Sequence, residues 1–156
     1  MRKRKIYLDT SVISHLYQLD VPDKMNDTLA LWEEIKQGNY DVYISQVTLD
    51  EIAENDEQKR ALLLAHLAEI DYTFIAMDDE IRTYADKVVE EEILTSKRYD
   101  DCLHIGCAVV HECHMIISWN FKHIVKVKTV NGVRSVNSML GYHSIDIFSP
   151  NMMIEG

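Results

Sequence analysis

Short apolar runs alternate with segments of helical periodicity along this chain. The apolar runs, which favour buried strands, are residues 6–8, 42–44, 72–76, 115–119 and 145–148. The segments in which apolar residues recur every three or four positions, which favour helices, are residues 23–38, 47–54, 57–69, 78–92, 100–112 and 125–140. Parallel strands need long crossover connections, and such helices supply them. We therefore predict an α/β fold, a three-layer α/β/α sandwich around a central, mainly parallel sheet of about five strands.

Residues with special backbone preferences mark the ends of these elements. Thr10 or Ser11 can cap a short helix after the first strand, while Gly38 and Gly141 suit helix C-termini. Gly132 is a weak point inside the last long helix, because glycine disfavours helix interiors. We find no linker and no internal repeat, so we expect residues 1–156 to form a single domain.

Charge is unevenly distributed along the chain. Hydrophobic residues make up 47% of it, enough for a core, but the formal net charge of −10 would by itself count against a nucleic-acid partner. The whole acidic excess lies in residues 50–92, which hold 14 acids and four bases. Residues 118–134 hold bases only: Lys122, Lys126, Lys128 and Arg134. The charge therefore does not exclude a nucleic-acid partner. We expect the acids of residues 50–92 other than Glu51 to face away from any groove that binds one.

Cysteine content and hydropathy bear on the cellular compartment. Cys102, Cys107 and Cys113 are odd in number and crowded into one segment, which is a poor basis for a disulfide framework. Asp9 follows the basic start of the chain too soon for a signal peptide, and no apolar run approaches the roughly 18 residues of a membrane span. We expect a cytoplasmic protein with no membrane association.

Four polar residues are predicted at the edge where the parallel strands end, which is where sites gather in such sheets. Asp9 ends the first strand, and Glu51 lies in the helix after the second. Asp101 opens the helix before the strand at 115–119, and Asn120 follows that strand. Carboxylates brought together repel one another, and a divalent cation removes the repulsion; oxygen ligands favour Mg²⁺ or Mn²⁺. Such a site can activate water and clamp a phosphodiester.

Four short motifs add a family resemblance. In chain order they are IYLDTSVIS (6–14), SQVTLDEI (45–52), DCLHIGCA (101–108) and SWNFKHI (118–124). Each motif is weak alone, but in this order and spacing they resemble the PIN-domain ribonucleases, and the resemblance continues into residues 137–150. The VapC-type toxins of toxin-antitoxin pairs are the most similar members. The fold expected from the resemblance is the PIN-like version of the sandwich above.

The resemblance implies a function and a set of site residues. It implies an Mg²⁺- or Mn²⁺-dependent endoribonuclease that hydrolyses RNA phosphodiester bonds as the toxin of a toxin-antitoxin pair. Asp9, Glu51 and Asp101 would be metal ligands, and with Asn120 they would form the catalytic set. The supporting residues would be Thr10, Ser11 and Ser118. The RNA-contact candidates are Lys122, His123 and Lys126. The partners implied are RNA, an antitoxin protein that covers the active groove, and a second copy in a homodimer.

Two positions depart from the simplest family pattern. The family often has a fourth Asp where this chain has Asn120, and an amide supplies no charge, so the resemblance leaves one or two metals open. A neutral oxygen can still ligate a metal or hold a metal-bound water. Asp100 is the alternative to Asp101 as the ligand, although the spacing to Leu103 and His104 favours Asp101.

Each candidate also has a purely structural interpretation. Asp9 can cap the following helix, Asp101 can stabilise a helix N-terminus, and Glu51 can be one more solvated acid. Asn120 can cap a short helix, and the basic stretch after it can be solvated surface or a track for RNA phosphates. His104 is expected to be a packed helix histidine. A zinc site is disfavoured because the candidate ligands lack paired spacing: Cys107, His111, Cys113 and His114.

Two other functions remain to be weighed. A catalytically weakened PIN-like RNA-binding or protein-interaction module is favoured by Asn120 and by the acidic surface. An aspartyl-phosphate protein with Asp9 as acceptor is disfavoured, because that family requires an Asp where this chain has Ser11.

Overall fold

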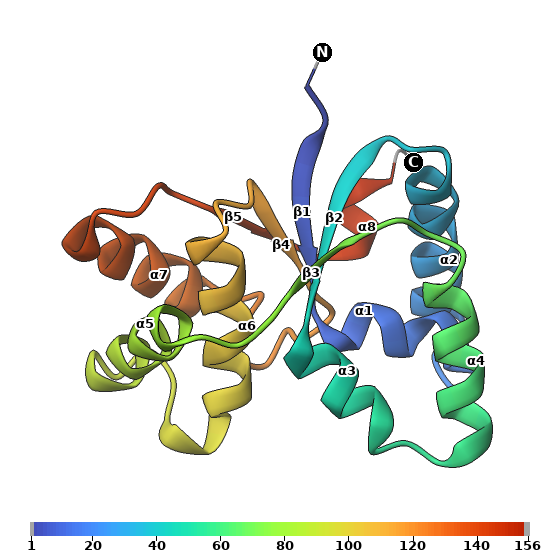
Figure 1. Ribbon diagram of the computed structural model, residues 1–156, viewed down its shortest axis with the longest axis horizontal. Helices are drawn as coiled ribbons and strands as arrows, with labels where there is room; N and C mark the ends of the chain where they lie inside the picture. Colours follow the sequence, from blue (N-terminus) through green and yellow to red (C-terminus); the bar gives the residue numbers. More distant parts are fainter. Residues whose placement is uncertain (1, 155–156) are drawn as a thin grey trace.

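Five strands and eight α-helices lie within residues 2–154, the part of the chain that the computed structural model describes (Figure 1). The strands are β1 (Arg4–Leu8), β2 (Tyr40–Ser45), β3 (Thr73–Ile75), β4 (Met115–Ile117) and β5 (Asp146–Phe148). The helices are α1 (Thr10–Ser14), α2 (Pro22–Lys36), α3 (Gln46–Ala53), α4 (Glu57–Leu67), α5 (Asp79–Glu90), α6 (Tyr99–Val110), α7 (Val127–Leu140) and α8 (Pro150–Met153). Short 3₁₀ helices at His15–Tyr17 and Ser96–Arg98 adjoin α1 and α6.

The strands form one parallel sheet in the order β3-β2-β1-β4-β5. Tyr7 in the central strand β1 lies opposite Tyr43 of β2 and Ile116 of β4. Because all five strands run the same way, their carboxyl ends meet at one edge of the sheet. The predicted α/β fold with a parallel five-stranded sheet is confirmed.

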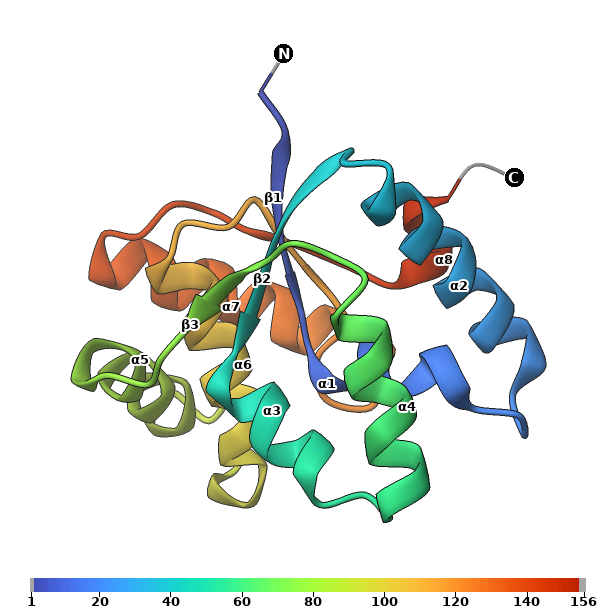
Figure 2. The same cartoon turned by 45° about the vertical axis from the view of Figure 1, so that its right-hand side comes forward.

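Helices cover both faces of the sheet and bury it. Figures 1 and 2 show α5, α6 and α7 on one face and α2, α4 and α8 on the other. Along β1, Ile6 and Leu8 pack into the cluster beneath α2 and α4, whereas Tyr7 packs into the cluster beneath α5, α6 and α7. A strand buried on both faces needs apolar side chains at every position, which is why β1 is a continuous apolar run rather than an alternating one.

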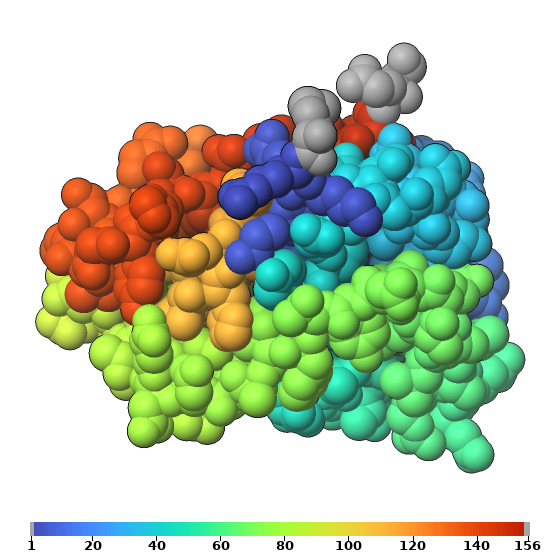
Figure 3. Space-filling model, turned by 45° about the horizontal axis from the view of Figure 1, so that its top comes forward, coloured from blue at the N-terminus to red at the C-terminus, as the bar shows by residue number. Residues whose placement is uncertain are grey.

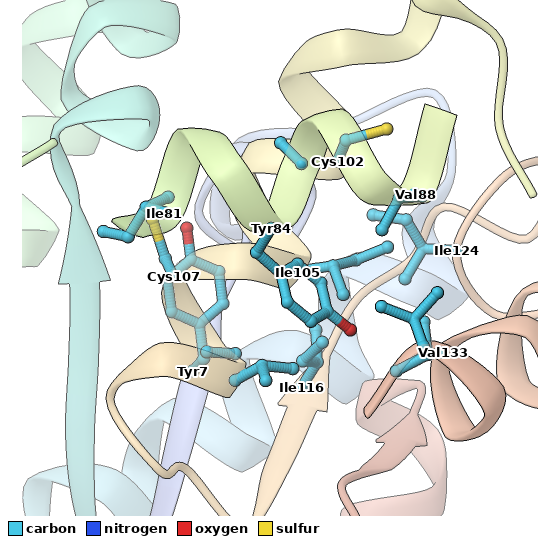
Figure 4. Packing of buried hydrophobic residues seen from close by; sticks show 14 of the residues in the cluster. Tyr7, Ile81, Tyr84, Val88, Cys102, Ile105, Cys107, Ile116, Ile124 and Val133 are labelled. Carbon is cyan, nitrogen blue, oxygen red and sulfur yellow. The ribbon is translucent and has the colours of Figure 1, made fainter. Parts of the chain in front are cut away.

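The cluster beneath α5, α6 and α7 includes the three cysteines. Figure 4 shows Tyr7 beside Cys107, with Tyr84 and Ile105 packed across from Ile116. Cys102, Cys107 and Cys113 are all buried free thiols, and burial raises the pKa of each to about 12. Such thiols are protonated and unreactive, so they serve the core.

The element boundaries differ from the predictions in places. Asp9, rather than Thr10 or Ser11, caps α1, because its backbone is still extended while its Oδ1 accepts the Val12 N–H at 3.3 Å. Gly132 does not interrupt α7, whereas Gly141 ends it with a left-handed φ of +82° as expected. Residues 121–124 form turns instead of a short helix.

The opposite, amino edge of the sheet holds a cavity of about 690 Å³. Figure 3 looks towards this edge, where the first described residues (blue) lie between segments coloured orange and cyan. Basic and acidic side chains mix there, among them Arg4, Lys5, Asp41 and Asp146. This cavity lies a full strand length from the carboxyl edge, where the predicted site residues lie, so it is not part of that site. Within residues 2–154 no helix is both long and apolar enough to span a membrane.

Candidate active site

The carboxyl edge brings together the four residues predicted there. Asp9 directly follows β1, Glu51 lies in α3 after β2, and Asn120 lies in the loop after β4. Asp101 reaches the same edge from the first turn of α6. The Asn120 amide donates to Asp101 Oδ1 at 3.3 Å, and the charges of Asp9 and Glu51 both act on Asp101. The spatial cluster therefore includes every predicted catalytic residue.

Asp9 is nearly inaccessible, with 3% of its surface exposed, and is held by two serines. Ser11 donates to one carboxylate oxygen and Ser118 to the other, both at 2.5 Å. Each serine hydroxyl also accepts a backbone N–H from the loop after β4: Trp119 N reaches Ser11 at 2.8 Å, and Asn120 N reaches Ser118 at 2.9 Å. The two serines therefore fix the carboxylate against both α1 and this loop.

Two of the carboxyl groups resist ionisation. Burial raises the pKa of Asp9, although His104 and the two serine donors oppose the shift. Burial also raises the pKa of Asp101, and the negative charges of Asp9 and Glu51 raise it further. A buried cluster of like charges is costly unless a cation neutralises it, so this edge of the sheet suits a positively charged ligand.

Glu51 is held differently, by a threonine and a histidine. Thr10 Oγ1 donates to Glu51 Oε1 at 2.7 Å, and His104 Nε2 lies 2.7 Å from the same oxygen. Burial alone would raise the pKa of Glu51, but the His104 hydrogen bond and charge, together with the Thr10 donor, lower it. Glu51 therefore ionises more readily than its burial alone would allow, and Thr10 is one of the two groups that hydrogen-bond it.

His104 was predicted to be a packed helix residue, but it does more than fill space. It is 2% exposed, and its second ring nitrogen hydrogen-bonds the Tyr7 hydroxyl, which in turn bonds Ser45 Oγ at 2.7 Å. Burial alone would lower the pKa of His104, but the bond to Glu51 and the charges of the neighbouring carboxylates raise it. The signal available in the sequence was its spacing three residues after Asp101, which places both on one face of α6.

Asn120 serves both the turn and the site. Its Oδ1 accepts the His123 N–H at 2.9 Å, and only the oxygen of an amide can accept this bond. The NH₂ group therefore faces Asp101. Asn120 is a donor to a site carboxylate, and its oxygen is already used within its own turn.

Basic side chains gather beside Asn120. Lys122 and Lys126 are exposed, and with Arg98 they place positive charge around the half-buried His123. Burial and these three charges lower the pKa of His123. The sequence singled out Lys122, His123 and Lys126, whereas Arg98 comes from the 3₁₀ helix before α6 and could not be placed without the fold.

Some of the acids responsible for the net charge accept hydrogen bonds from tyrosine hydroxyls. Asp86 accepts from the Tyr99 hydroxyl at 2.8 Å, and Glu80 accepts from the Tyr142 hydroxyl at 2.6 Å. Asp100 is exposed, whereas its neighbour Asp101 is half-buried and hydrogen-bonded to Asn120. Of these two neighbouring acids, Asp101 is the one that lies near Asp9, Glu51 and Asn120.

The carboxylate oxygens at this edge suit a hard divalent cation, but they are not arranged as a complete coordination shell. Within residues 2–154, no group of three or more His, Cys, Asp or Glu side chains is arranged to hold a metal ion. At the carboxyl edge, Glu51 Oε1 is engaged by Thr10 and His104. Around the cysteines, Cys107 and Cys113 are buried in the core, and His114 accepts the Lys5 N–H. Asp9, Glu51 and Asp101 still supply only oxygens, as Mg²⁺ and Mn²⁺ prefer.

Comparisons with known proteins agree with this fold. A solved structure of VapBC2 from Rickettsia felis bound to a DNA fragment from their promoter contains a similar chain, with 15% sequence identity and a TM-score of 0.59. The similarity covers 93% of this chain and 98% of that one. No curated protein sequence gives a significant match. The sequence profile of the PIN domain family matches residues 6–122, which contain Asp9, Glu51, Asp101 and Asn120. The chain therefore belongs to the PIN domain family, whose members are generally nucleases.

Proposed function

We propose that this protein is an Mg²⁺- or Mn²⁺-dependent endoribonuclease and the toxin of a toxin-antitoxin pair. The observation that carries the proposal is the cluster of Asp9, Glu51 and Asp101 at the carboxyl edge of the sheet, where two of the three carboxyl groups have raised pKa values. Carboxyl groups with perturbed pKa values in one cluster are typical of functional sites.

Asp9, Glu51 and Asp101 are the residues that would hold the cation. When bound, a divalent cation lowers the pKa of water and polarises a phosphoryl oxygen. The protein's part is to orient the carboxylates and to offset, through hydrogen bonds, part of the cost of ionising buried carboxyl groups. Ser11 and Ser118 stabilise ionised Asp9, because both donate to it, and Thr10 does the same for Glu51.

His104 adds a positioning contact behind Glu51. With both ring nitrogens protonated, it donates to Glu51 from Nε2 and to the Tyr7 oxygen from Nδ1, and Tyr7 can then donate to Ser45. Tyr7, Ser45 and His104 are buried, so little water reaches the bonds behind Glu51. The chain holds Glu51 in one orientation before any cation arrives.

The basic residues beside Asn120 supply the attraction for RNA. Lys122, His123, Lys126 and Arg98 adjoin the carboxylate cluster on its loop side. Phosphate contacts of this kind provide affinity that does not depend on sequence. They offset the repulsion between the carboxylates and the RNA backbone.

The partner proposals rest on similarity. The resemblance of the motifs to VapC-type toxins, together with the fold shared with the VapBC2 structure, supports an antitoxin protein as partner. A homodimer is proposed on the same resemblance, and the cytoplasm is proposed as the compartment. Co-purification with the product of a neighbouring small gene would test the antitoxin, and light scattering would test the dimer.

Cleavage of a labelled RNA with Mg²⁺, with Mn²⁺ and with EDTA tests the activity. We expect cleavage with either metal, none in EDTA, and none by Asp9→Asn or Asp101→Asn. Asp41→Asn is the matched control, because Asp41 is exposed at the amino edge of the sheet, and it should cleave like the wild type. Equal activity of the wild type and Asp9→Asn would refute the site assignment.

A second candidate function follows from Asn120 and Glu51. Asn120 lacks charge and directs its NH₂ group at Asp101, and Glu51 is already paired with His104. Both features suit a catalytically weakened module that binds RNA or protein. Titration with Mn²⁺, followed by its paramagnetic resonance signal, separates the two functions: the nuclease takes up Mn²⁺ and loses this uptake in Asp9→Asn, whereas the binding module takes up none.

A further inference from the structure

An aromatic pair and a lysine lie next to the proposed catalytic residues. Trp119 and Phe121 flank Asn120, and their rings meet edge to face with centroids 5.9 Å apart. Lys24 of α2 places its ammonium 5.4 Å from the Trp119 ring centroid and 5.2 Å from that of Phe121. Residues about a hundred positions apart in the chain thus form one surface feature, which we name the Phe121 platform: Lys24, Trp119 and Phe121.

The platform is rigid at its base and open at its top. Trp119 is 6% exposed, and its ring N–H donates to Thr28 Oγ1 at 2.8 Å; Thr28 in turn donates to the Lys24 carbonyl at 2.6 Å. These bonds tie the indole to α2. Phe121, in contrast, is 45% exposed. An exposed aromatic ring on a fixed support can bind a flat ligand with little loss of side-chain entropy.

The platform is connected to the carboxylate cluster. The Trp119 backbone N–H donates to Ser11 Oγ, and Ser11 holds Asp9. Asn120, between the two aromatic residues, donates to Asp101. A ligand group on Phe121 would therefore adjoin whatever occupies the carboxylate cluster.

The charge beside the ring is positive, and no carboxylate in the described part of the chain neutralises it in an ion pair. Lys24 takes part in none of the ion pairs formed within residues 2–154. Lys122, next to Phe121, is exposed and is likewise in none of them. An exposed aromatic ring beside cations that form no ion pair with the described residues suits a nucleobase and the phosphates next to it.

We propose that the Phe121 platform is a subsite for one unpaired nucleotide of single-stranded RNA, next to the position cleaved. The base stacks on Phe121, and Lys24 contacts an adjoining phosphate. The inference rests on the proposed ribonuclease function and narrows its substrate to RNA whose bases are free to leave the helix. Duplex RNA keeps its bases stacked and paired, so it cannot offer one to the ring.

Binding measurements in EDTA separate this subsite from catalysis. The Trp32→Phe variant leaves Trp119 as the single tryptophan, and its fluorescence should change when a single-stranded oligoribonucleotide binds but not when the duplex of the same sequence is added. Phe121→Ala should weaken single-strand binding about tenfold, since stacking on one aromatic ring contributes about that much or more. Phe121→Tyr should retain the affinity, because it keeps the ring.

Salt dependence tests Lys24 separately. Each phosphate contact to a single strand contributes about 0.7 to the slope of log affinity against log salt, so Lys24→Gln should lower that slope by roughly this amount. The matched controls are Phe74→Ala and Lys3→Gln. Phe74 is 43% exposed on β3, and Lys3 is exposed at the amino edge. Both control variants should bind RNA like the wild type.

The outcomes distinguish this inference from the proposed function. If wild type cleaves RNA with Mn²⁺ while Phe121→Ala and Lys24→Gln bind and cleave single strands unchanged, the subsite is wrong and the nuclease stands. If wild type cleaves no RNA yet binds single strands through Phe121, the nuclease is wrong and the platform stands as a binding site for an unpaired nucleotide. Equal binding of single-stranded and duplex RNA overturns the subsite. So does a Phe121→Ala variant that binds RNA normally but loses a protein partner, because the platform is then a protein interface.

Discussion

Ser118→Ala removes a hydroxyl that hydrogen-bonds two groups of the proposed active site at once. Ser118 is fully buried; its Oγ donates to Asp9 Oδ2 and accepts the Asn120 N–H at 2.9 Å. Alanine fits the space without strain but restores neither bond. The variant therefore leaves a buried carboxylate with one donor fewer and a backbone N–H without an acceptor.

The magnitude follows from these two losses. A hydrogen bond to a charged group contributes about 1.5–3 kcal/mol, and an unsatisfied buried donor costs about 1–3 kcal/mol. Because the loop can relax and water can enter, we expect the free energy of unfolding to fall by about 3 kcal/mol. For a chain of this length the thermal midpoint should fall by roughly 6–12 °C.

Urea unfolding in EDTA at neutral pH measures this cost, with Ser149→Ala as the matched control. Ser149 is equally buried, but its hydroxyl donates only to the neutral Asn151 side chain, so its loss should cost about 1 kcal/mol. The difference in unfolding free energy between Ser118→Ala and the wild type should also depend on pH. Ser118 stabilises the ionised form of Asp9, so the Ser118→Ala penalty is largest above the raised pKa of Asp9 and shrinks as the pH falls through it. Equal penalties for the two serines, or a Ser118→Ala penalty independent of pH, would refute the reasoning.

Three further predictions concern the site and the packing behind it. Asp9→Asn should raise the free energy of unfolding by about 1 kcal/mol, measured by urea titration in EDTA at neutral pH. Burial raises the pKa of Asp9, so the amide removes a charge that is costly in the folded state. A loss of stability would contradict this. His104→Gln should lower the free energy of unfolding more at about pH 6 than at about pH 9, because the contribution of a histidine with a raised pKa is lost as the pH rises through that pKa. The contribution of Glu51 is lost in acid instead, as the pH falls through its lowered pKa. Gly132→Ala should destabilise by about 1 kcal/mol despite the helix preference of alanine, because the new Cβ would lie 2.5 Å from Ile93 Cγ1 and crowding outweighs propensity; Ser135→Ala, exposed on the same helix, should be neutral or slightly stabilising in the same urea titration.

The sequence predicted the fold class because its apolar pattern is a local property. A run such as residues 6–8 must be buried on both faces, and helical segments between such runs leave few arrangements besides a covered parallel sheet. Residues at strand ends were placed for the same reason: Asp9 and Asn120 each follow an apolar run directly. The continuity of α7 through Gly132 could not be predicted in the same way. Helix propensity disfavours glycine there, but the glycine leaves room for Ile93, which packs against it.

Only the tertiary structure decided which partners each site residue has. Thr10, Glu51 and His104 come from three elements, and their hydrogen bonds depend on how α1, α3 and α6 meet at the sheet edge. The same holds for Lys24, whose place over the rings of Trp119 and Phe121 depends on the packing of α2. Periodicity states which side of an element is buried, but not which neighbour it meets. The sequence by itself therefore determined the sheet and its acidic edge, whereas the ionisation of Glu51, the part played by His104 and the position of Lys24 were set by contacts between distant segments.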